Sequence, residues 1–396
     1  MSNTLTSLKQ ASIDWRLVMM STVLVAIALT FNVLSDGVFF SPENLYNIAQ
    51  QTAVVGIVST VVVLVIVARH IDLSVGSVMG FVGILIATLQ YTAGWSWQAA
   101  SLAGLAAAIA VSMYQGALTA VLGVPSFVVT LGGLMSFRGA AFLVADGKTQ
   151  PVTNPFFLSL GGGYDGAIGT SASWIIALLM SAALIAAMVS KRRAKSAYQV
   201  PNNPVWLDAL VVLIPVGIVL GFAATMNAYQ IPNKDAPQGI PIPVLIWAAV
   251  AFSLSFLVHR TRFGRYIFAM GGNPEAAALV GIPVRKVTLM LFALMGVLIT
   301  IAAIVSIARL NAGTNSLGTS MELYVIAAAV IGGTALSGGS GSILGSVLGA
   351  LIMQSIDSGM LLLDVSIGMR YVIIGQVLIV AVVFDVLYRK LTGDTV

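Results

Sequence analysis

The chain has 396 residues, of which 58% are hydrophobic and only 8% are charged, and its formal net charge is +5. A soluble globular protein carries about 25% charged residues, so this composition excludes an ordinary soluble domain. Apolar runs long enough to cross a hydrocarbon core of about 30 Å recur along the chain. Because lipid cannot satisfy the backbone groups of open strands, we predict an all-α, polytopic bundle of transmembrane helices. There is no cysteine, which excludes disulfides and a thiol nucleophile.

The apolar runs predict about ten to twelve spans. The first, near 17–35, follows Lys9 and Arg16, and no small-residue cleavage site comes after it. We therefore interpret it as an uncleaved anchor rather than a signal peptide. The other spans are expected near 48–68, 73–92, 99–123, 127–145, 172–190, 206–226, 241–259, 287–309, 322–337, 341–359 and 369–388. Glycines in 332–345 leave open whether the pieces there are broken or re-entrant helices.

Basic residues segregate to one side of this predicted bundle. If the N-terminus is cytoplasmic, the internal ones are Lys9, Arg16, Arg69, Lys191, Arg192, Arg193, Lys195, Arg260, Arg262, Arg265, Arg285, Lys286, Arg389 and Lys390. Only Lys148, Lys234, Arg309 and Arg370 remain near the outside. By the positive-inside rule, we expect both chain termini to be cytoplasmic.

A polar break interrupts the apolar pattern at "ARHIDLSVGS", residues 68–77. Arg69 and Asp72 are three residues apart and suited to pair on one helix face. Asp72 and Ser74 are suited to cap a helix that starts near Val75. Charged groups at membrane depth cost about 2.5–3.5 kcal/mol each, so they usually face protein or water. Two interpretations stay open: a capped break at the cytoplasmic interface, or a break that lines a pathway.

The same break belongs to a weak internal repeat. "VIVARHIDLSVGSVMG" at 65–80 aligns with "VIGGTALSGGSGSILG" at 330–345, and both read as an apolar run, a polar break and a small-residue helix. Transporters are commonly built from repeats whose interrupted helices meet near the pathway. Small-residue patterns also arise in packed membrane helices, so both explanations remain. Residues 191–240, with one span between Pro- and Asn-rich turns, are interpreted as an insertion.

The other motifs predict neither catalysis nor binding of a nucleotide or a metal. "ADGKTQP" at 145–151 resembles the end of a phosphate-binding loop, but Phe142 stands where the first glycine is required and no strand precedes it. We interpret this segment as an outside loop, and the chain is not expected to bind ATP itself. His70 and His259 belong to no ligand-spaced cluster. We expect no metal, no cofactor, no catalytic residues and no nucleic-acid partner.

The segment "RFGRYIFAMGGNPEAAALVGIPVRK" lies between two apolar runs and contains a short helix with a start and a stop. Asn273 is a good N-cap, Pro274 suits the first helical position, and Glu275 favours the positive end of the helix dipole. Gly281 is suited to a left-handed C-terminal position. Such a helix is about 10 Å long and is unstable alone, so it must dock on something.

Its apolar face is small. Ala276, Leu279 and Val280 share this face, on the side that the charges place in the cytoplasm. One interpretation is an amphipathic helix lying on lipid headgroups. Because three alanines make a poor lipid anchor, we favour docking on a partner protein.

Several segments, in order, cover nearly the whole chain: "NLYNIAQQTAVVGI" (44–57), "HIDLSVGS", "VPSFVVTLGGLMSFRG" (124–139), "FGRYIFAMGGNPEAAALVGIPV", "VIGGTALSGGSGSILG" and "SIDSGMLLLDV" (355–365). Together they resemble the permease subunit of ribose/xylose-type monosaccharide ABC importers. The inserted span and "SGMLLLDV" are most similar to the xylose-type permeases. A departure is the pair Arg69 and His70, since such permeases usually carry a smaller or acidic residue before "IDLS".

The resemblance implies a single permease domain over residues 1–396, in a bacterial inner membrane, with a coupling segment at 262–286. It implies a transporter subunit rather than an enzyme. The implied partners are a separate ABC ATPase subunit, a periplasmic sugar-binding protein, a second copy of the chain, membrane lipid and a monosaccharide, with xylose or a similar sugar as the substrate. Glu275, Ala276, Ala277 and Gly281 match the family's coupling loop, Glu-Ala-Ala-x-x-x-Gly.

Polar residues inside spans or at their breaks are candidates for the translocation pathway: Asp72, Ser74, Arg138, Asn311, Glu322 and Tyr324. Arg138 lies among apolar and small residues, so we expect it to have a partner or to face a water-filled pathway. A rival hypothesis is a secondary transporter, which needs an ionisable residue near mid-membrane for its coupling ion. A third is the same fold serving another small polar solute.

Overall fold

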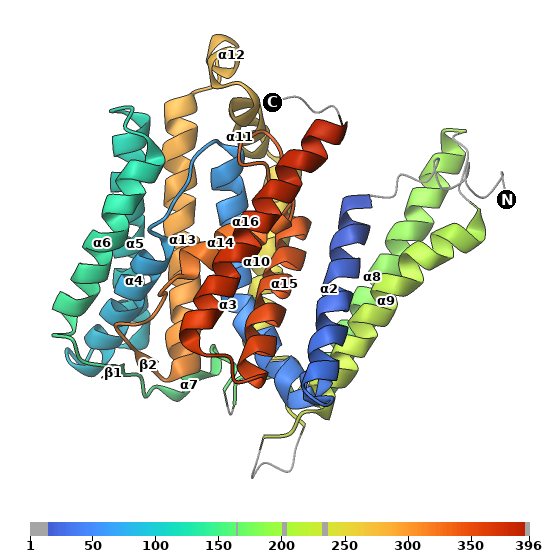
Figure 1. Ribbon diagram of the computed structural model, residues 1–396, viewed down its shortest axis with the longest axis horizontal. Coiled ribbons are helices and arrows are strands. Elements are labelled where there is room, and N and C mark those ends of the chain that lie inside the picture. Colours follow the sequence, from blue (N-terminus) through green and yellow to red (C-terminus); the bar gives the residue numbers. More distant parts are fainter. Residues whose placement is uncertain (1–14, 164, 200–203, 232–236, 393–396) are drawn as a thin grey trace.

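Helices make up almost all of the regular structure. The computed structural model describes residues 15–163, 165–199, 204–231 and 237–392 (Figure 1). In chain order its elements are α2 (Trp15–Leu34), the 3₁₀ helix η1 (Val38–Phe40), α3 (Pro42–Val67), α4 (Val75–Tyr91), α5 (Trp97–Ala120), α6 (Ser126–Val144), β1 (Gln150–Pro151), α7 (Pro155–Ser159), α8 (Gly169–Ala197), α9 (Val205–Ala228), α10 (Ile242–Arg260), α11 (Arg262–Gly272), α12 (Pro274–Leu279), α13 (Val284–Leu310), β2 (Ala312–Gly313), α14 (Met321–Ile331), α15 (Ile343–Leu362) and α16 (Ile367–Thr392). The predicted all-α class is confirmed.

Ten helices of the described chain are long and apolar enough to cross a membrane. Two predicted spans are shorter, since α4 has 17 residues and α14 has 11. At about 1.5 Å per residue, α14 is roughly 16 Å long, about half a hydrocarbon core. A full crossing over 322–337 is therefore wrong, because α14 ends at Ile331 and the chain then turns through Gly333 in the left-handed region (φ 89°). The range of ten to twelve spans is confirmed.

Helix α3 forms the centre of the bundle. Its apolar stretch is 94% buried, and it packs against α10, α13, α14 and α15. A helix that is hydrophobic all round is stable either in lipid or packed among other helices, and here helices surround it. It begins with Pro42 at the first helical position, after Ser41, whose Oγ accepts a hydrogen bond from the backbone N–H of Asn44 at 3.3 Å. This valine- and isoleucine-rich helix is thereby the packed core.

The outer helices expose apolar side chains instead. The apolar stretches of α2, α5, α6, α8, α9, α10 and α16 are only 6% to 28% buried, as expected for the periphery of a multi-pass membrane protein. Helices α8 and α9, which contain most of the predicted insertion, pack on each other and lie at the opposite side of the bundle from α6 (Figure 1). Phe222 and Met226 of α9 join them to Tyr46 of α3.

The two ends of the bundle differ in charge. The start of α2, the end of α16 and helix α12 lie at one end, whereas β1, β2 and α7 lie at the other (Figure 1). Arg16, Arg260 and Arg285 are in the terminal turns of α2, α10 and α13 at the α12 end. Lys148 lies just before β1 at the other end. The chain termini, residues 1–14 and 393–396, lie outside the described residues, as does Lys234.

Candidate functional site

The polar break after α3 is a loop held in place by side-chain hydrogen bonds. Asp72 is only 3% exposed, and its Oδ1 accepts hydrogen bonds from the backbone N–H and the hydroxyl of Ser74, both at 2.7 Å. The amide of Gln115 donates to the Ser74 hydroxyl at 3.0 Å. The predicted helix start at Val75 is confirmed, with Ser74 at the N-cap position. Its hydroxyl bonds to Asp72, however, and does not cap α4.

Helix α6 holds the same loop. The backbone N–H of Ile71 donates to Ser126 Oγ at 3.0 Å, and that of Leu73 donates to Thr130 Oγ1 at 3.1 Å. These side chains replace the backbone partners that a continuous helix would have supplied. The break is therefore a fixed part of the protein interior.

The expected pair of Arg69 with Asp72 does not form among the described residues. Arg69 has φ 64°, and its guanidinium donates to the carbonyls of Gly271 and Gly272 at 2.7 and 2.6 Å. The expectation assumed a helix through residues 69–72, in which side chains three apart share a face. Because α3 ends at Val67, the two side chains diverge.

Two glycines let the loop 311–320, between α13 and α14, touch the backbone of α4. A Cβ on Gly76 would lie 2.2 Å from the carbonyl oxygen of Gly318, and one on Gly80 would lie 2.5 Å from that of Leu317. Small residues four apart commonly permit such close approach in membrane proteins. The start of α4 and this loop thus form one packed unit.

Arg138 of α6 reaches the same loop. Its Nη1 donates to the carbonyl of Leu317 at 2.8 Å and to that of Asn315 at 3.2 Å. Of the two expectations for Arg138, a partner or a water-filled pathway, the partner is confirmed, and it consists of backbone carbonyls. Its charge also interacts with Glu322 in the first turn of α14.

Glu322 is the third ionisable group beside α4. It interacts electrostatically with Arg138 and Asp72, and a Cβ on Gly76 would lie 2.6 Å from its Oε2. That oxygen is buried and has no hydrogen-bond partner in the part of the chain that the structure describes. Four of the predicted pathway residues therefore lie around the start of α4: Asp72, Ser74, Arg138 and Glu322.

A second polar region, here called the central cavity, is an open pocket with a volume of about 270 Å³, bounded by α3, α4, α13, the loop 311–320, α14 and α15. Its polar lining consists of Gln51, Ser306, Arg309, Thr314, Ser316, Thr319, Tyr324, Gln354 and Asp357. Small-molecule sites typically measure about 300–1,000 Å³, so this volume lies just below that range and suits a small solute only. The predicted pathway residue Tyr324 lies here.

The polar groups of the central cavity are bonded across helices. Gln354 of α15 donates to the Gln51 amide oxygen of α3 at 2.6 Å. The Tyr324 hydroxyl donates to Asp357 Oδ1 at 2.8 Å, and Arg370 Nη2 donates to the same oxygen at 2.6 Å. Amides and hydroxyls both donate and accept hydrogen bonds, so this lining fits a ligand rich in hydroxyl groups.

Sequence reasoning did not select Gln51, Gln354 or Asp357 for the pathway. A signal was present, because these side chains interrupt apolar spans and polar residues within spans are often functional.

The structure does not bring Asn311 to the other candidates. It ends α13 in the left-handed region (φ 54°), is exposed, and accepts a hydrogen bond from the backbone N–H of Val152 at 3.0 Å.

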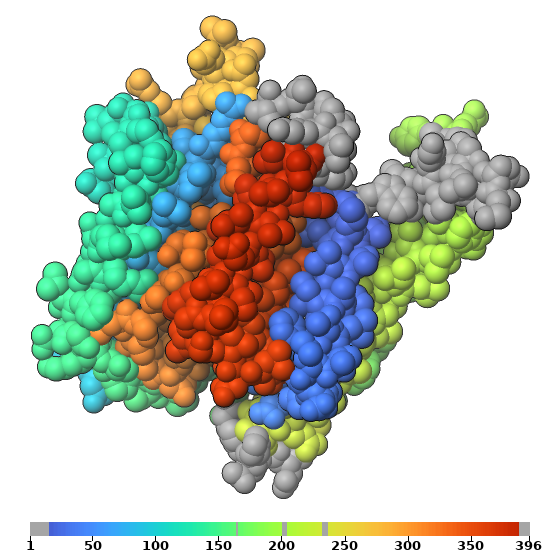
Figure 2. All heavy atoms as spheres, viewed as in Figure 1, coloured from blue at the N-terminus to red at the C-terminus, as the bar shows by residue number. Residues whose placement is uncertain are grey.

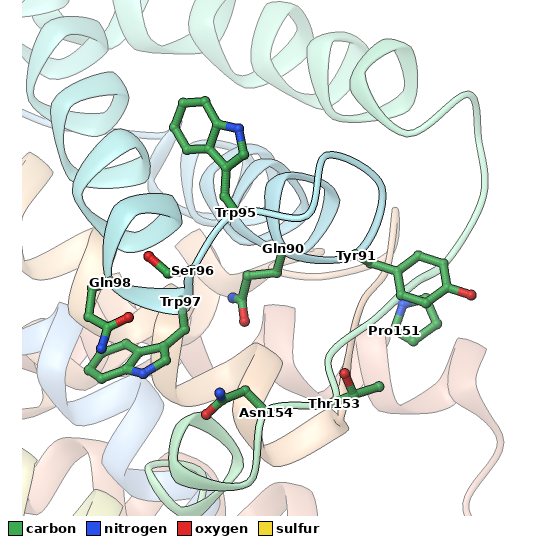
Figure 3. A pocket seen from close by; sticks show the side chains of 9 residues that line it. All are labelled: Gln90, Tyr91, Trp95, Ser96, Trp97, Gln98, Pro151, Thr153 and Asn154. Carbon is green, nitrogen blue, oxygen red and sulfur yellow. The ribbon is translucent and has the colours of Figure 1, made fainter.

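An open cleft of about 420 Å³ lies at the end of the bundle opposite α12, formed by the α4–α5 turn and the segment before α7. Figure 3 shows Trp97, Gln98 and Asn154 around it, with Trp95 directed away. The Trp97 ring lies 5.1 Å from that of Phe156. Tyr and Trp at a bundle end are typical of the membrane interface, so this cleft is read as part of the aromatic belt.

The remaining motifs are at the surface. Lys148 pairs with Asp146 at 2.9 Å, and this ammonium lowers the pKa of the Asp146 carboxyl. Both side chains are exposed, as expected for a loop at one end of the bundle. His259 lies in the last turn of α10, and its Nδ1 is 2.8 Å from the Ser255 carbonyl oxygen. No group of three or more His, Asp or Glu side chains that could hold a metal occurs among the described residues.

Helix α12 has the predicted start and stop. Asn273 Oδ1 accepts a hydrogen bond from the backbone N–H of Ala276 at 3.0 Å, and Pro274 is the first helical residue. Gly281 takes the left-handed conformation with φ 85°. The local sequence therefore determines this helix, as capping theory requires.

The apolar face of α12 is exposed. Leu279 is 88% exposed and Val280 is 79% exposed, and Ala276 is also exposed. Ala277, on the other face, is 4% exposed and joins the main hydrophobic core. Figure 2 shows α12 protruding from the end of the bundle. Two large apolar side chains at the tip of a short anchored helix form a surface suited to docking a protein.

A bundle of long apolar helices around a polar cavity, with interrupted helices beside it, defines a multi-pass membrane transport protein. The chain belongs to the family described as branched-chain amino acid transport system / permease component, whose family model matches residues 44–382.

Individual relatives are sugar permeases. The xylose transport system permease protein XylH of Haemophilus influenzae is 35% identical over 96% of this chain and 99% of its own length. XylH of Escherichia coli K12 is 36% identical over 94% of this chain and 92% of its own length. The ribose import permease protein RbsC of the same strain is 30% identical over 92% of this chain and 90% of its own length. No solved structure matches the chain.

Proposed function

We propose that this chain is the permease subunit of an ATP-driven importer that moves a monosaccharide, xylose or a similar sugar, across a bacterial inner membrane. The observation that carries the proposal is a central cavity with an amide and hydroxyl lining, in a chain that is 35–36% identical to xylose permeases over 94–96% of its length. The whole chain, residues 1–396, is proposed to act as one permease domain, with 191–240 as an insertion.

The translocation pathway is proposed to use two polar regions on either side of the loop 311–320. One consists of Asp72, Ser74, Arg138 and Glu322 at the start of α4, and the other is the central cavity with Tyr324, Gln51, Gln354 and Asp357. The loop is a wall of the cavity through Leu317, whose carbonyl also accepts from Arg138. Asn311 is placed at the edge of this route. Arg309 also lines the cavity and is proposed to contact the sugar.

Helix α12 is proposed to couple the permease to a separate ABC ATPase subunit in the cytoplasm. The residues assigned to this role are Asn273, Pro274, Glu275, Ala276, Ala277, Leu279 and Gly281. The exposed apolar face and the basic residues at the same bundle end support this orientation, with both termini cytoplasmic. The assembly would further include a periplasmic sugar-binding protein, a second copy of the chain and surrounding lipid.

Uptake measurements test this function. The chain, its ATPase and its binding protein are reconstituted in proteoliposomes, and labelled xylose and ribose are added with the binding protein. We expect uptake that requires ATP and persists when ionophores dissipate proton and sodium gradients. Uptake that needs a gradient and not ATP would establish the rival secondary transporter. ATP-dependent uptake of an amino acid, with no uptake of either sugar, would assign the fold to another solute.

A further inference from the structure

The turn Arg69–His70 contacts the chain on both sides of helix α12. On the N-terminal side, Arg69 Nε donates to the Gly271 carbonyl at 2.7 Å and Nη2 donates to the Gly272 carbonyl at 2.6 Å. Gly272 directly precedes Asn273, the N-cap of α12. One guanidinium therefore fixes the two peptide groups that lead into the exposed helix.

On the C-terminal side, His70 contacts α13, the helix that follows α12. Its Nε2 lies 3.4 Å from the Thr288 hydroxyl, and its ring centroid is 6.0 Å from that of Phe292. The His70 backbone N–H donates to the Val65 carbonyl at 2.9 Å, which fixes the turn to the end of α3. Two adjacent residues thus connect the core helix to both flanks of α12.

Close backbone packing makes this connection stiff. A Cβ on Gly271 would lie 1.8 Å from the Val67 carbonyl oxygen and 2.8 Å from the Gly339 nitrogen. The Gly339 N–H donates to that Val67 carbonyl at 2.9 Å, and a Cβ on Gly338 would lie 2.4 Å from Arg69 Cγ. The end of α3, the end of α11 and the loop 332–342 are therefore in direct backbone contact, here called the glycine junction.

The other side of the turn leads to the pathway. Arg69 is three residues before Asp72, and the intervening loop is bonded to α6 through Ser126 and Thr130. Asp72 in turn fixes Ser74 at the start of α4. Arg69 is held in a left-handed conformation that a non-glycine residue seldom adopts, and its two side-chain hydrogen bonds add to the backbone hydrogen bonds that close the turn.

We propose that Arg69, with His70 beside it, is the positioning residue that transmits displacement of α12 to the polar break and the start of α4. The inference rests on the proposed function, in which α12 docks on an ATPase. Arginine suits this role because its planar fork donates to two carbonyls at once, whereas the lysine ammonium is a single point charge. Movement of α12 would displace the Gly271 and Gly272 carbonyls and, through their hydrogen bonds, Arg69. The loop between α3 and α4, which is hydrogen-bonded to α6, would then transmit this displacement to the start of α4.

The test compares Arg69→Gln and Arg69→Lys with the parent, by sugar uptake, ATP hydrolysis and the amount of ATPase bound to the membrane. Arg69→Gln is expected to keep the ATPase bound and to lower the sugar taken up per ATP hydrolysed at least about tenfold. Arg69→Lys should be intermediate, and His70→Ala should lower the same ratio. As a control, Arg193→Gln removes an equal charge from an exposed position on α8, outside the coupling segment, and should match the parent.

A parental ratio of uptake to hydrolysis in Arg69→Gln would overturn the proposal. So would loss of the ATPase from the membrane, because Arg69 would then only maintain the docking surface. If Arg69→Gln does not accumulate in the membrane, Arg69→Lys decides by the same ratio, and a parental value refutes transmission. Failure of the proposed function is seen separately, as a parent chain that shows no ATP-dependent sugar uptake.

Discussion

Leu279→Ala should weaken binding of the ATPase subunit, because Leu279 is 88% exposed in the free chain and has nearly its whole side chain to bury. The change removes three carbons, and burial of each contributes about 0.8 kcal/mol, so full burial predicts a loss of about 2.4 kcal/mol, or roughly fiftyfold in affinity. Leu279→Glu also buries an unpaired charge, which costs several kcal/mol more and should abolish binding. Ala276→Arg acts in the same way. Binding is measured by titrating purified ATPase onto proteoliposomes.

A matched control separates docking from general damage. Leu122 is 69% exposed in the turn between α5 and α6, at the same end of the bundle as α12. Leu122→Glu should leave ATPase affinity within about twofold of the parent, and all variants should accumulate normally because none of these side chains is buried. Gly281→Val should act more mildly, by straining a left-handed residue (φ 85°). Parental affinity in Leu279→Glu would refute the assignment of α12 as the docking element.

Three further predictions concern orientation and the pathway. Because the chain has no cysteine, single substitutions report topology: Lys148→Cys should react with an impermeant thiol reagent added outside and Lys195→Cys should not, and reversed labelling would invert the bundle. Arg138→Leu should lower uptake about tenfold or more at unchanged abundance, since hydrogen bonds to charged groups contribute about 1.5–3 kcal/mol; equal uptake would make this arginine a bystander. Gln354→Leu should raise the KM for sugar roughly fivefold without changing ATPase binding, as expected for loss of about 1 kcal/mol, and an unchanged KM would remove the central cavity from the pathway.

The sequence alone was sufficient for features that depend on a few neighbouring residues. Asn273, Pro274 and Gly281 predicted both ends of α12, because capping bonds reach only three or four residues. Apolar runs predicted the spans, since transfer into lipid depends on composition over about 20 residues. The predicted span 322–337 was too long because α14 ends at Ile331, directly before Gly332 and Gly333, the glycines for which the sequence had left a broken helix open.

The tertiary structure decided what the polar residues contact. Gln51 and Gln354 are 303 positions apart, and Arg69 and Gly271 are 202 positions apart, so no local pattern relates them. Their meeting depends on glycines that let backbones approach and on α3 becoming the packed centre. The sequence predicted a partner or a water-filled pathway for Arg138, because an isolated charge in an apolar run is costly, and left Asp72 either at the cytoplasmic interface or on the pathway. The packing of the helices determines which groups these two side chains contact. Hydropathy and capping are properties of single segments, whereas a cavity or a junction is a property of several helices packed together.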